Sequence, residues 1–372
     1  MASAEKLREI FSLIEKLEEY SFEIGPIRPP SEGGSYSLLI RVTRNCPWRL
    51  CTFCYGTLYN REKFQLRSVE EVKKDIKNVR AMVNLLKEIS LKLGYNGEIN
   101  LRLGETILEY DTTLRHNPYF INVFNWLYSG GKTVFLQDAD SLIISTKDLA
   151  EILSYLKSLF PQVERITSYA RAKTLLRKTV EELEELRKLG LSRLHVGLET
   201  GDDELLKLVN KGVTAKEHVE AGKKVIEAGI ELSEYIMPGL GGKIFSKQHA
   251  LNTAKVLNKI NPHYIRMRTF VPVLNTPLYE DYVKGRFKLL SPHECLREIK
   301  LLIENLNVTS RVCFDHFINP SLKGNIPIFR QSYEGYKFPE EKSSVLKTID
   351  EALKIDESKF RWTEELVGIP HL

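Results

Sequence analysis

Three cysteines lie within nine residues near the start of the chain, at Cys46, Cys51 and Cys54. An apolar run, Leu38-Leu39-Ile40, comes just before this thiol-rich loop and has the character of a buried strand. Closely spaced thiolates can converge on one metal centre, such as an iron–sulfur cluster. Three thiolates on a four-iron cluster leave one iron open to another ligand. The spacing therefore predicts a metal site that can also hold a bound molecule.

Zinc is the alternative metal for the same loop. A structural zinc site takes four protein ligands, so it needs one more donor from elsewhere in the chain. His195, His263 and His316 are available for that role. A zinc-stabilised nucleic-acid-binding module would also need a basic stripe interleaved with aromatic residues, which the sequence lacks. A third possibility, an electron-transfer protein that carries a cluster, does not require a chain of 372 residues.

The composition fits a globular protein with a weakly basic surface. The chain is 42% hydrophobic and carries a formal net charge of +5, which is compatible with an anionic substrate but does not require one. Cys295 and Cys313 stand far from the cluster and are either buried free thiols or a pair. No apolar run approaches the roughly 20 residues that span a bilayer. The N-terminus has the spacing of an amphipathic helix rather than a signal peptide, so we expect a cytoplasmic protein.

Strand-like and helix-like patterns alternate between Ser37 and Phe270. Repeated β-α units joined by short glycine turns specify a parallel sheet with helices outside it. About six such units fit this region, so we expect an α/β fold, a partial (β/α)6 TIM-like barrel with N- and C-terminal extensions. The strands are expected at 37–42, 132–136, 165–169, 193–197, 230–237 and 264–270, and the helices at 68–93, 146–159, 179–189, 214–228 and 247–259.

The same patterns predict that the chain is divided into three structural parts. Residues 1–36 form an N-terminal helix and a loop at 25–35, residues 37–280 form the barrel core, and residues 281–372 form a C-terminal α/β extension. About 90 residues separate the first two strands, which is longer than one crossover helix needs. We therefore expect an insertion at about 94–130, which is either a lid over the barrel mouth or a structural satellite.

The cysteine loop, with Phe53 just before its last cysteine, resembles that of the radical S-adenosylmethionine (SAM) enzymes. Their common spacing is Cys-x3-Cys-x2-Cys, and this chain has one more residue in the first gap. The run from Val196 to Gly201 is similar to the Gly-x-Glu-Ser-Gly element of the subgroup with oxygen-independent coproporphyrinogen oxidase and the tRNA methylthiotransferases. The sequence has no second cysteine set for an auxiliary cluster, which makes a methylthiotransferase role less favoured.

This resemblance implies a [4Fe–4S] cluster on Cys46, Cys51 and Cys54, with SAM as the second cofactor. It implies that the cluster reductively cleaves SAM to a 5′-deoxyadenosyl radical, which abstracts hydrogen from an unidentified substrate. It also implies an oxygen-sensitive enzyme and a one-electron donor such as a ferredoxin or flavodoxin. No side chain is assigned a catalytic role from the sequence.

The resemblance places SAM against residues that end successive strands. The Gly-Gly-Glu turn that holds the SAM amino group in the family is missing, and an amide or carboxylate could replace it. Arginine could face the SAM carboxylate, and a glycine turn could let the backbone approach adenine, although a plain β-α turn explains the glycines too. The expected cofactor-binding residues are Phe53, Gln137, Asp138, Asp140, Arg171, Glu199 and Gly239.

Several arginines complete the set of candidate residues. Arg41, Arg44 and Arg49 flank the cysteine loop and could offset the charge of a cluster. Arg266 and Arg268 alternate on the sixth expected strand, so both would point to the same side of it. Buried arginines are costly without an anion or carboxylate partner, so we expect such partners beside them.

Overall fold

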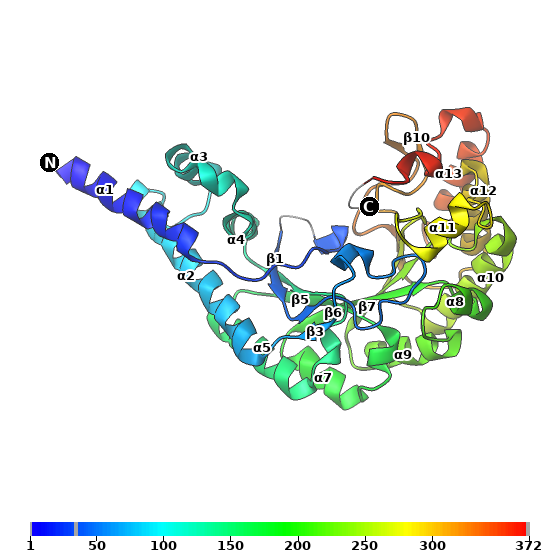
Figure 1. The fold of residues 1–372 in the computed structure, drawn as a ribbon, viewed down its shortest axis with the longest axis horizontal. Helices are drawn as coiled ribbons and strands as arrows, with labels where there is room; N and C mark the ends of the chain where they lie inside the picture. The colour runs from blue at the N-terminus through cyan, green and yellow to red at the C-terminus, as the bar shows by residue number, and fades with distance from the viewer. Residues whose placement is uncertain (1, 33–35, 370–372) are drawn as a thin grey trace. The chain divides into compact units, whose positions relative to one another are not determined.

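The computed structural model describes residues 2–32 and 36–369, so three residues of the expected loop at 25–35 lie outside the described part. The chain divides into two compact units, which are drawn in Figure 1. The first unit comprises Met1–Arg44, Gln65–Ser168 and Lys188–Ser192. The second comprises Asn45–Phe64, Tyr169–Arg187 and Arg193–Leu372. The cysteine loop therefore belongs to the second unit.

The first unit is built on parallel strands in the order β1 (Ser37–Arg41), β4 (Thr133–Gln137) and β5 (Arg165–Ala170). Their apolar residues are fully buried, as expected for a parallel sheet covered by helices. Figure 1 shows α2 (Val69–Leu93) beside α5 (Thr146–Leu159), and the two helices pack together.

Helix α2 shows why the sequence predicted these elements well. Ser68 accepts a hydrogen bond from the Glu71 N–H, and the Glu71 carboxylate accepts from the Ser68 N–H, which is a capping box. Buried residues then recur at helical spacing along one face. Gly94 ends the helix in the left-handed conformation, with φ of 87°.

The expected insertion consists of helices. It contains α3 (Leu101–Tyr110), η4 (Thr112–His116) and α4 (Pro118–Tyr128). Asn122 of α4 accepts from the Leu39 N–H at 3.1 Å and donates to the Ser37 carbonyl at 3.1 Å. These bonds satisfy backbone groups on the open side of β1, which is an edge strand. Helix α4 therefore has a structural role in the first unit.

The remaining N-terminal elements also belong to the first unit. Helix α1 (Ala2–Glu15) continues into η1 (Lys16–Glu19), and α1 packs against α2 and α3. The short strands β2 (Thr43–Arg44) and β3 (Gln65–Leu66) pair antiparallel at the two ends of the cysteine loop.

The second unit has four parallel strands and an antiparallel one, in the order β6-β7-β8-β9-β12. A two-stranded hairpin, β10 and β11, lies in the C-terminal part. The strands are β6 (Leu191–Glu199), β7 (Glu231–Ile236), β8 (Tyr264–Met267), β9 (Arg311–Cys313), β10 (Ser321–Leu322), β11 (Ile326–Pro327) and β12 (Tyr336–Lys337). The helices are α6 (Ala172–Leu175), α7 (Val180–Lys188), α8 (Asp203–Leu208), α9 (Ala215–Glu227), α10 (Gly242–Ile260), α11 (Pro277–Val283), α12 (Pro292–Glu304) and α13 (Lys342–Ala352).

The predicted α/β class with parallel strands is confirmed, and the chain order of strands and helices is that of the expected (β/α)6 partial barrel. Helix α10 begins at Gly242, five residues before the predicted start at 247, because its N-cap Gly241 offers no side-chain signal. Cys295 and Cys313 are both free and buried, which decides between the two expectations for them. Among the described residues, no helix is both long and apolar enough to cross a membrane.

Candidate functional site

The cysteine loop closes into a tight turn around its last two cysteines. The N–H groups of Cys54 and Tyr55 both donate to the Cys51 carbonyl, at 3.1 and 2.7 Å. The Thr57 N–H donates to the Cys54 carbonyl at 3.0 Å, which begins η3 (Thr57–Tyr59). Both Cys51 and Cys54 pack against the same buried cluster.

The three thiols are free and partly buried, and they influence one another. Burial raises the pKa of Cys51 to about 12; Lys211 opposes this rise, whereas Cys54 and Cys46 add to it. Burial also raises the pKa of Cys54, with a further contribution from Cys46. Because thiolates are the ligating form, a bound metal would replace these protons. Within residues 2–32 and 36–369, no three His, Cys, Asp or Glu side chains are already arranged around a metal position.

A cluster of buried apolar side chains in the second unit packs against the cysteine loop. Phe53 is 8% exposed and packs in a cluster against which Cys51 and Cys54 also pack. The Thr52 N–H donates to the Val209 carbonyl at 2.9 Å, and the Thr52 carbonyl accepts from the Leu278 N–H at 3.1 Å. We call the other buried members of the cluster the apolar floor: Leu205, Val209, Leu240, Phe270, Leu278 and Leu289.

Trp48 ties the first half of the loop to the segment after α8. Its Nε1 donates to the Asn210 carbonyl at 2.7 Å, and its ring lies against Gly212, where an added Cβ would collide with it. The Arg171 guanidinium lies 5.2 Å from the centroid of the Trp48 ring. Arg171 Nη2 also donates to the Lys211 carbonyl at 3.2 Å. Arg171 and Trp48 therefore fix the backbone at residues 210–212.

Lys211 and Glu199 form an ion pair beside the thiols. Lys211 Nζ is 2.9 Å from Glu199 Oε1, and each side chain is 13% exposed. Glu199 has a φ of 60°, in the left-handed region that non-glycine residues rarely adopt. A Cβ at Gly197 would collide with Glu199 Oε1, so the Gly-Leu-Glu sequence leaves room for this pair. Lys211 Nζ is 5.7 Å from the centroid of the Phe53 ring.

Two buried titratable groups, Glu234 and His218, belong to the same electrostatic environment. Burial raises the pKa of Glu234 well above its ordinary value. Burial, together with the cations Lys211 and Arg171, lowers the pKa of His218 to about 3. His218 is therefore neutral at pH 7, and Glu234 favours its neutral form. The cations Lys211 and Arg171 and the carboxylate of Glu199 all act on this environment, which suits a ligand that carries charged groups.

Gly239 lies in the glycine turn between β7 and α10, with a φ of 85°. Its N–H donates to Glu298 Oε1 at 2.7 Å. Glu298 is buried on α12, and burial raises its pKa although His249 opposes the change. The buried carboxyl group of Glu298 therefore fixes the backbone of this turn at Gly239.

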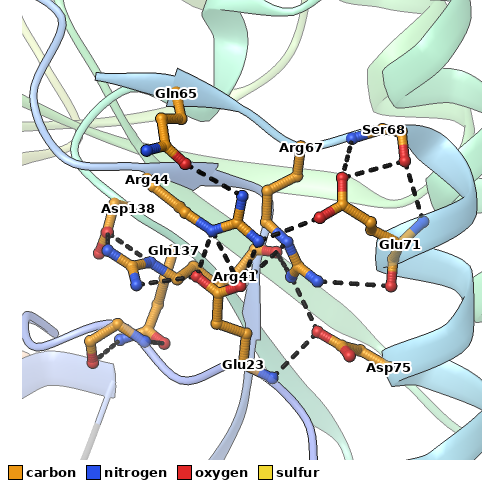
Figure 2. Close-up of polar contacts among 11 residues, drawn as sticks. Glu23, Arg41, Arg44, Gln65, Arg67, Ser68, Glu71, Asp75, Gln137 and Asp138 are labelled. Atoms are coloured by element: carbon orange, nitrogen blue, oxygen red, sulfur yellow. Dashed lines mark hydrogen bonds and ion pairs between the residues drawn. The ribbon is translucent and has the colours of Figure 1, made fainter. Parts of the chain in front are cut away.

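Gln137 and Asp138 end β4 in the first unit, where the N-terminal segment occupies them (Figure 2). Gln137 accepts from the Gly25 N–H at 2.9 Å and donates to the carbonyls of Gly25 and Ile27 at 3.0 and 2.7 Å. Asp138 accepts from Arg41 Nε at 2.7 Å, and a Cβ at Gly25 would collide with Asp138. Asp140 is fully buried in the same unit.

The arginines that flank the loop bind carboxylates or backbone carbonyls. Arg41 pairs with Glu23 and Asp138, and Arg44 pairs with Glu23 and Glu71 (Figure 2). Arg49 donates to the carbonyls of Arg61 and Glu62 at 3.1 and 2.9 Å. The cations that act on the thiols are instead Lys211 and Arg171.

The structure also places the remaining candidates of the second unit. Arg266 pairs with Asp315 at 2.6 Å, which supplies the carboxylate partner expected for a buried arginine. His263 Nδ1 accepts from the Leu232 N–H at 3.1 Å, and His195 packs between Tyr169 and Tyr235. His316 stacks on Phe317, with ring centroids 5.0 Å apart.

Sequence reasoning missed Lys211 and the role of Trp48. Lys211 lies three residues after the end of the short helix α8 and precedes Gly212, a pattern typical of any solvated helix end. The functional role of Lys211 depends on its ion pair with Glu199, which lies twelve positions earlier in the chain. Only the folded structure brings the two side chains together.

Part of the chain is similar to a known protein family and to two known proteins. Residues 121–252 match the family model of the Radical SAM superfamily, a region that begins after the cysteine loop. The chain is 24% identical over 120 residues to the tRNA uridine(34) acetyltransferase of Methanocaldococcus infernus, covering 32% of this chain and 22% of that protein. It is 24% identical over 160 residues to the heme chaperone HemW of Bacillus subtilis, covering 42% of this chain and 41% of that protein. The chain thus spans well under half the length of these relatives.

One solved structure is coproporphyrinogen III oxidase (HemN) from Escherichia coli, a radical SAM enzyme. It matches with 16% identity and a TM-score of 0.41 over 78% of this chain and 54% of that chain.

Proposed function

Because the chain carries a domain of the radical SAM superfamily, we propose that it is an enzyme that cleaves SAM reductively at the cysteine loop. Enzymes of this superfamily use a [4Fe–4S] cluster and SAM. When bound, the cluster supplies one electron to SAM, whose carbon–sulfur bond breaks to give methionine and a 5′-deoxyadenosyl radical. The observation that carries the proposal is the three-thiol loop with the Lys211–Glu199 pair beside it.

The donor set of the loop fits such a cluster. Cys46, Cys51 and Cys54 offer three thiols from one loop. The two other cysteines, Cys295 and Cys313, are buried on α12 and β9. In the proposal they are not ligands, so one iron stays open. Lys211 opposes the rise that burial causes in the pKa of the Cys51 thiol, and so favours the thiolate that a metal needs.

We propose that the charges beside the thiols orient SAM. Arg171 and Lys211 attract the carboxylate of its methionine part, and Glu199 attracts the ammonium group. Phe53 supplies an apolar wall, and the turn at Gly239 lets backbone come close to adenine.

The ends of β4 have a different role in this proposal. Gln137 and Asp138 hold the N-terminal segment at Gly25, and Asp140 is fully buried. We therefore leave these three residues out of the SAM-binding set. The substrate stays unassigned, because the chain covers only 22% of the archaeal acetyltransferase relative.

Metal loading tests the proposal at the level of the ligands. After anaerobic reconstitution with iron and sulfide, we expect about four irons per chain in the natural protein. Cys51→Ala should lose most of this iron, whereas Cys295→Ala should keep it, because Cys295 is buried in α12 and is not a proposed ligand. Equal iron in both variants, or binding of zinc in place of iron, would contradict the assignment.

A further inference from the structure

A pocket of about 170 Å³ opens in the second unit directly beside the cysteine loop. Thr52 lines it, and this residue follows Cys51 in the chain. The wall is mostly apolar and includes four members of the apolar floor: Leu205, Val209, Leu240 and Leu278.

The apolar floor connects this pocket to the proposed cluster. Cys51 and Cys54 pack against the cluster that contains the apolar floor, and four members of the floor line the pocket. A redox group held at the pocket would therefore contact the same packed cluster that two of the proposed ligands contact. A path through packed side chains favours electron transfer over a path through solvent.

The rim of the pocket has the character of a protein-binding surface. Ile244 and Leu208 line it and are 78% and 54% exposed. Contiguous exposed apolar side chains with a polar border mark interaction sites on soluble proteins. An apolar centre with an arginine-containing rim is also the usual composition of an interface.

The charged side chains of the rim indicate the charge of the partner that the pocket would bind. Of the charged side chains that line the pocket, Lys243, Arg286 and Lys288 are cationic and Asp281 is anionic. Arg286 pairs with Asp281, and Lys243 pairs with Glu294 at 2.9 Å. Lys288 is exposed and has no carboxylate partner within residues 36–369. The excess of positive charge complements an acidic surface.

We propose that this pocket and its rim, here called the donor face, dock an acidic one-electron donor protein with an exposed redox group. The inference rests on the proposed function, because it supplies the electron that SAM cleavage consumes. The donor loses one electron and the cluster gains it, and no atom or proton needs to move between the proteins. Electron-transfer complexes are small and short-lived, so charge complementarity governs how fast they form.

The test uses reduced and oxidised forms of an acidic flavodoxin as the probe. The double variant Lys243→Glu/Lys288→Glu reverses two charges of the donor face. Lys347→Glu is the matched control, because Lys347 lies on α13 with its side chain 78% exposed and does not line the pocket. Affinity for oxidised flavodoxin is measured by titration, and SAM cleavage is measured separately with reduced flavodoxin and with dithionite.

We expect the double variant to bind flavodoxin about tenfold more weakly and to cleave SAM about tenfold more slowly with flavodoxin. Cleavage driven by dithionite, a small reductant that needs no docking, should match the natural protein. Raising the ionic strength from about 0.01 M to about 0.15 M should weaken flavodoxin binding to the natural protein more than to the variant.

Two results would overturn the donor face. One is equal affinity and equal flavodoxin-driven rates in the double variant and in Lys347→Glu. The other is a dimer of this chain whose formation depends on Lys243 and Lys288. Failure of the natural protein to cleave SAM with dithionite would instead refute the proposed function, and the affinity measurement would still report on the surface.

Discussion

Gly197, Glu199 and Lys211 act as one group at the scale of single residues. Gly197 leaves the space, Glu199 adopts a φ of 60°, and Lys211 completes the ion pair at 2.9 Å. A residue held in a rarely adopted conformation persists only where the surroundings fix it, as they commonly do at ligand-binding sites. The pair is therefore a direct target for substitution.

Glu199→Ala should weaken SAM binding about tenfold, because it removes a charge-assisted contact to the ammonium group. The iron content should stay unchanged, since Glu199 is not a proposed ligand. Equilibrium dialysis with SAM measures the effect, and Glu204→Ala on the exposed face of α8 serves as the control. Unchanged SAM affinity in Glu199→Ala would remove this residue from the site.

Trp48→Phe should keep an aromatic ring in the loop, but lose the bond to the Asn210 carbonyl and part of the contact with Gly212. The lost hydrogen bond costs about 1 kcal/mol, and Trp48→Ala should cost more because packing is lost too. The measurement is the rate of iron release to a chelator, which should rise in the order natural protein, Trp48→Phe, Trp48→Ala. Equal release rates would show that Trp48 does not hold the loop.

The sequence indicated the thiols and also Phe53, Arg171 and Glu199, but not Lys211 or the role of Trp48, and the reason is physical. Metal ligands on one loop leave a spacing that can be recognised directly. Lys211, Arg171 and Trp48 come together only through backbone contacts between distant segments. Gln137 and Asp138 sit at a strand end as expected, but their partners lie more than 90 positions away.

Glu23 links several elements of the first unit, as Figure 2 shows. Its carboxylate pairs with Arg41 on β1, with Arg44 on β2 and with Arg67 next to α2. The Glu23 N–H donates to Asp75 of α2 at 3.0 Å. The N-terminal segment thereby fixes the base of the hairpin whose connecting loop carries the cysteines.

Glu71→Gln should reduce the loss of stability of the cluster-free protein in acid. The Ser68 N–H and then Arg44 lower the pKa of Glu71 to about 2. A lowered folded-state pKa stabilises the protein above the unfolded value of about 4.3, and this contribution is lost as pH falls towards 2. The side chain is 45% exposed, so screening limits the effect to less than about 1 kcal/mol.

Urea unfolding at pH 7 and pH 3 measures this difference. Glu70→Gln is the matched control. Glu70 is the neighbouring residue, its side chain is 83% exposed, and its ion pair with Lys73 is long, at 3.6 Å. A stability difference between pH 7 and pH 3 that is the same in both variants would contradict the role of Glu71.

Asn122→Ala should destabilise the protein by about 2 kcal/mol, because it leaves the Leu39 N–H and the Ser37 carbonyl without their partner. The free energy of unfolding in urea provides the measurement. Asn125→Ala, on the same helix and without these bonds, should cost less than half as much. Equal costs would show that α4 does not protect the edge of β1.

At the scale of elements, prediction succeeded where local signals were complete. Helices α2, α5 and α9 begin at side-chain caps, at Ser68, Ser145 and Thr214, and match their predicted ranges to within a residue or two. The early start of α10 and the short strands β10 to β12 carry no such caps or periodicity. Their positions follow from tertiary contacts instead.

Across the whole chain, the parallel β-α order was predictable because each unit repeats the same local pattern. The division into two units was not, since it depends on contacts between distant segments. The match to the Radical SAM superfamily covers residues 121–252, whereas the proposed ligands lie at 46–54. The central claim therefore needs a test that joins the superfamily chemistry to the cysteines themselves.

That test is the formation of 5′-deoxyadenosine from SAM under anaerobic conditions. The reconstituted protein is reduced with dithionite, SAM is added, and the product is measured by chromatography. We expect 5′-deoxyadenosine from the natural protein and from Cys295→Ala, and none from variants in which Cys46, Cys51 or Cys54 is replaced by Ala. A cluster-loaded natural protein that forms no 5′-deoxyadenosine, or a Cys51→Ala variant that still forms it, would contradict the account.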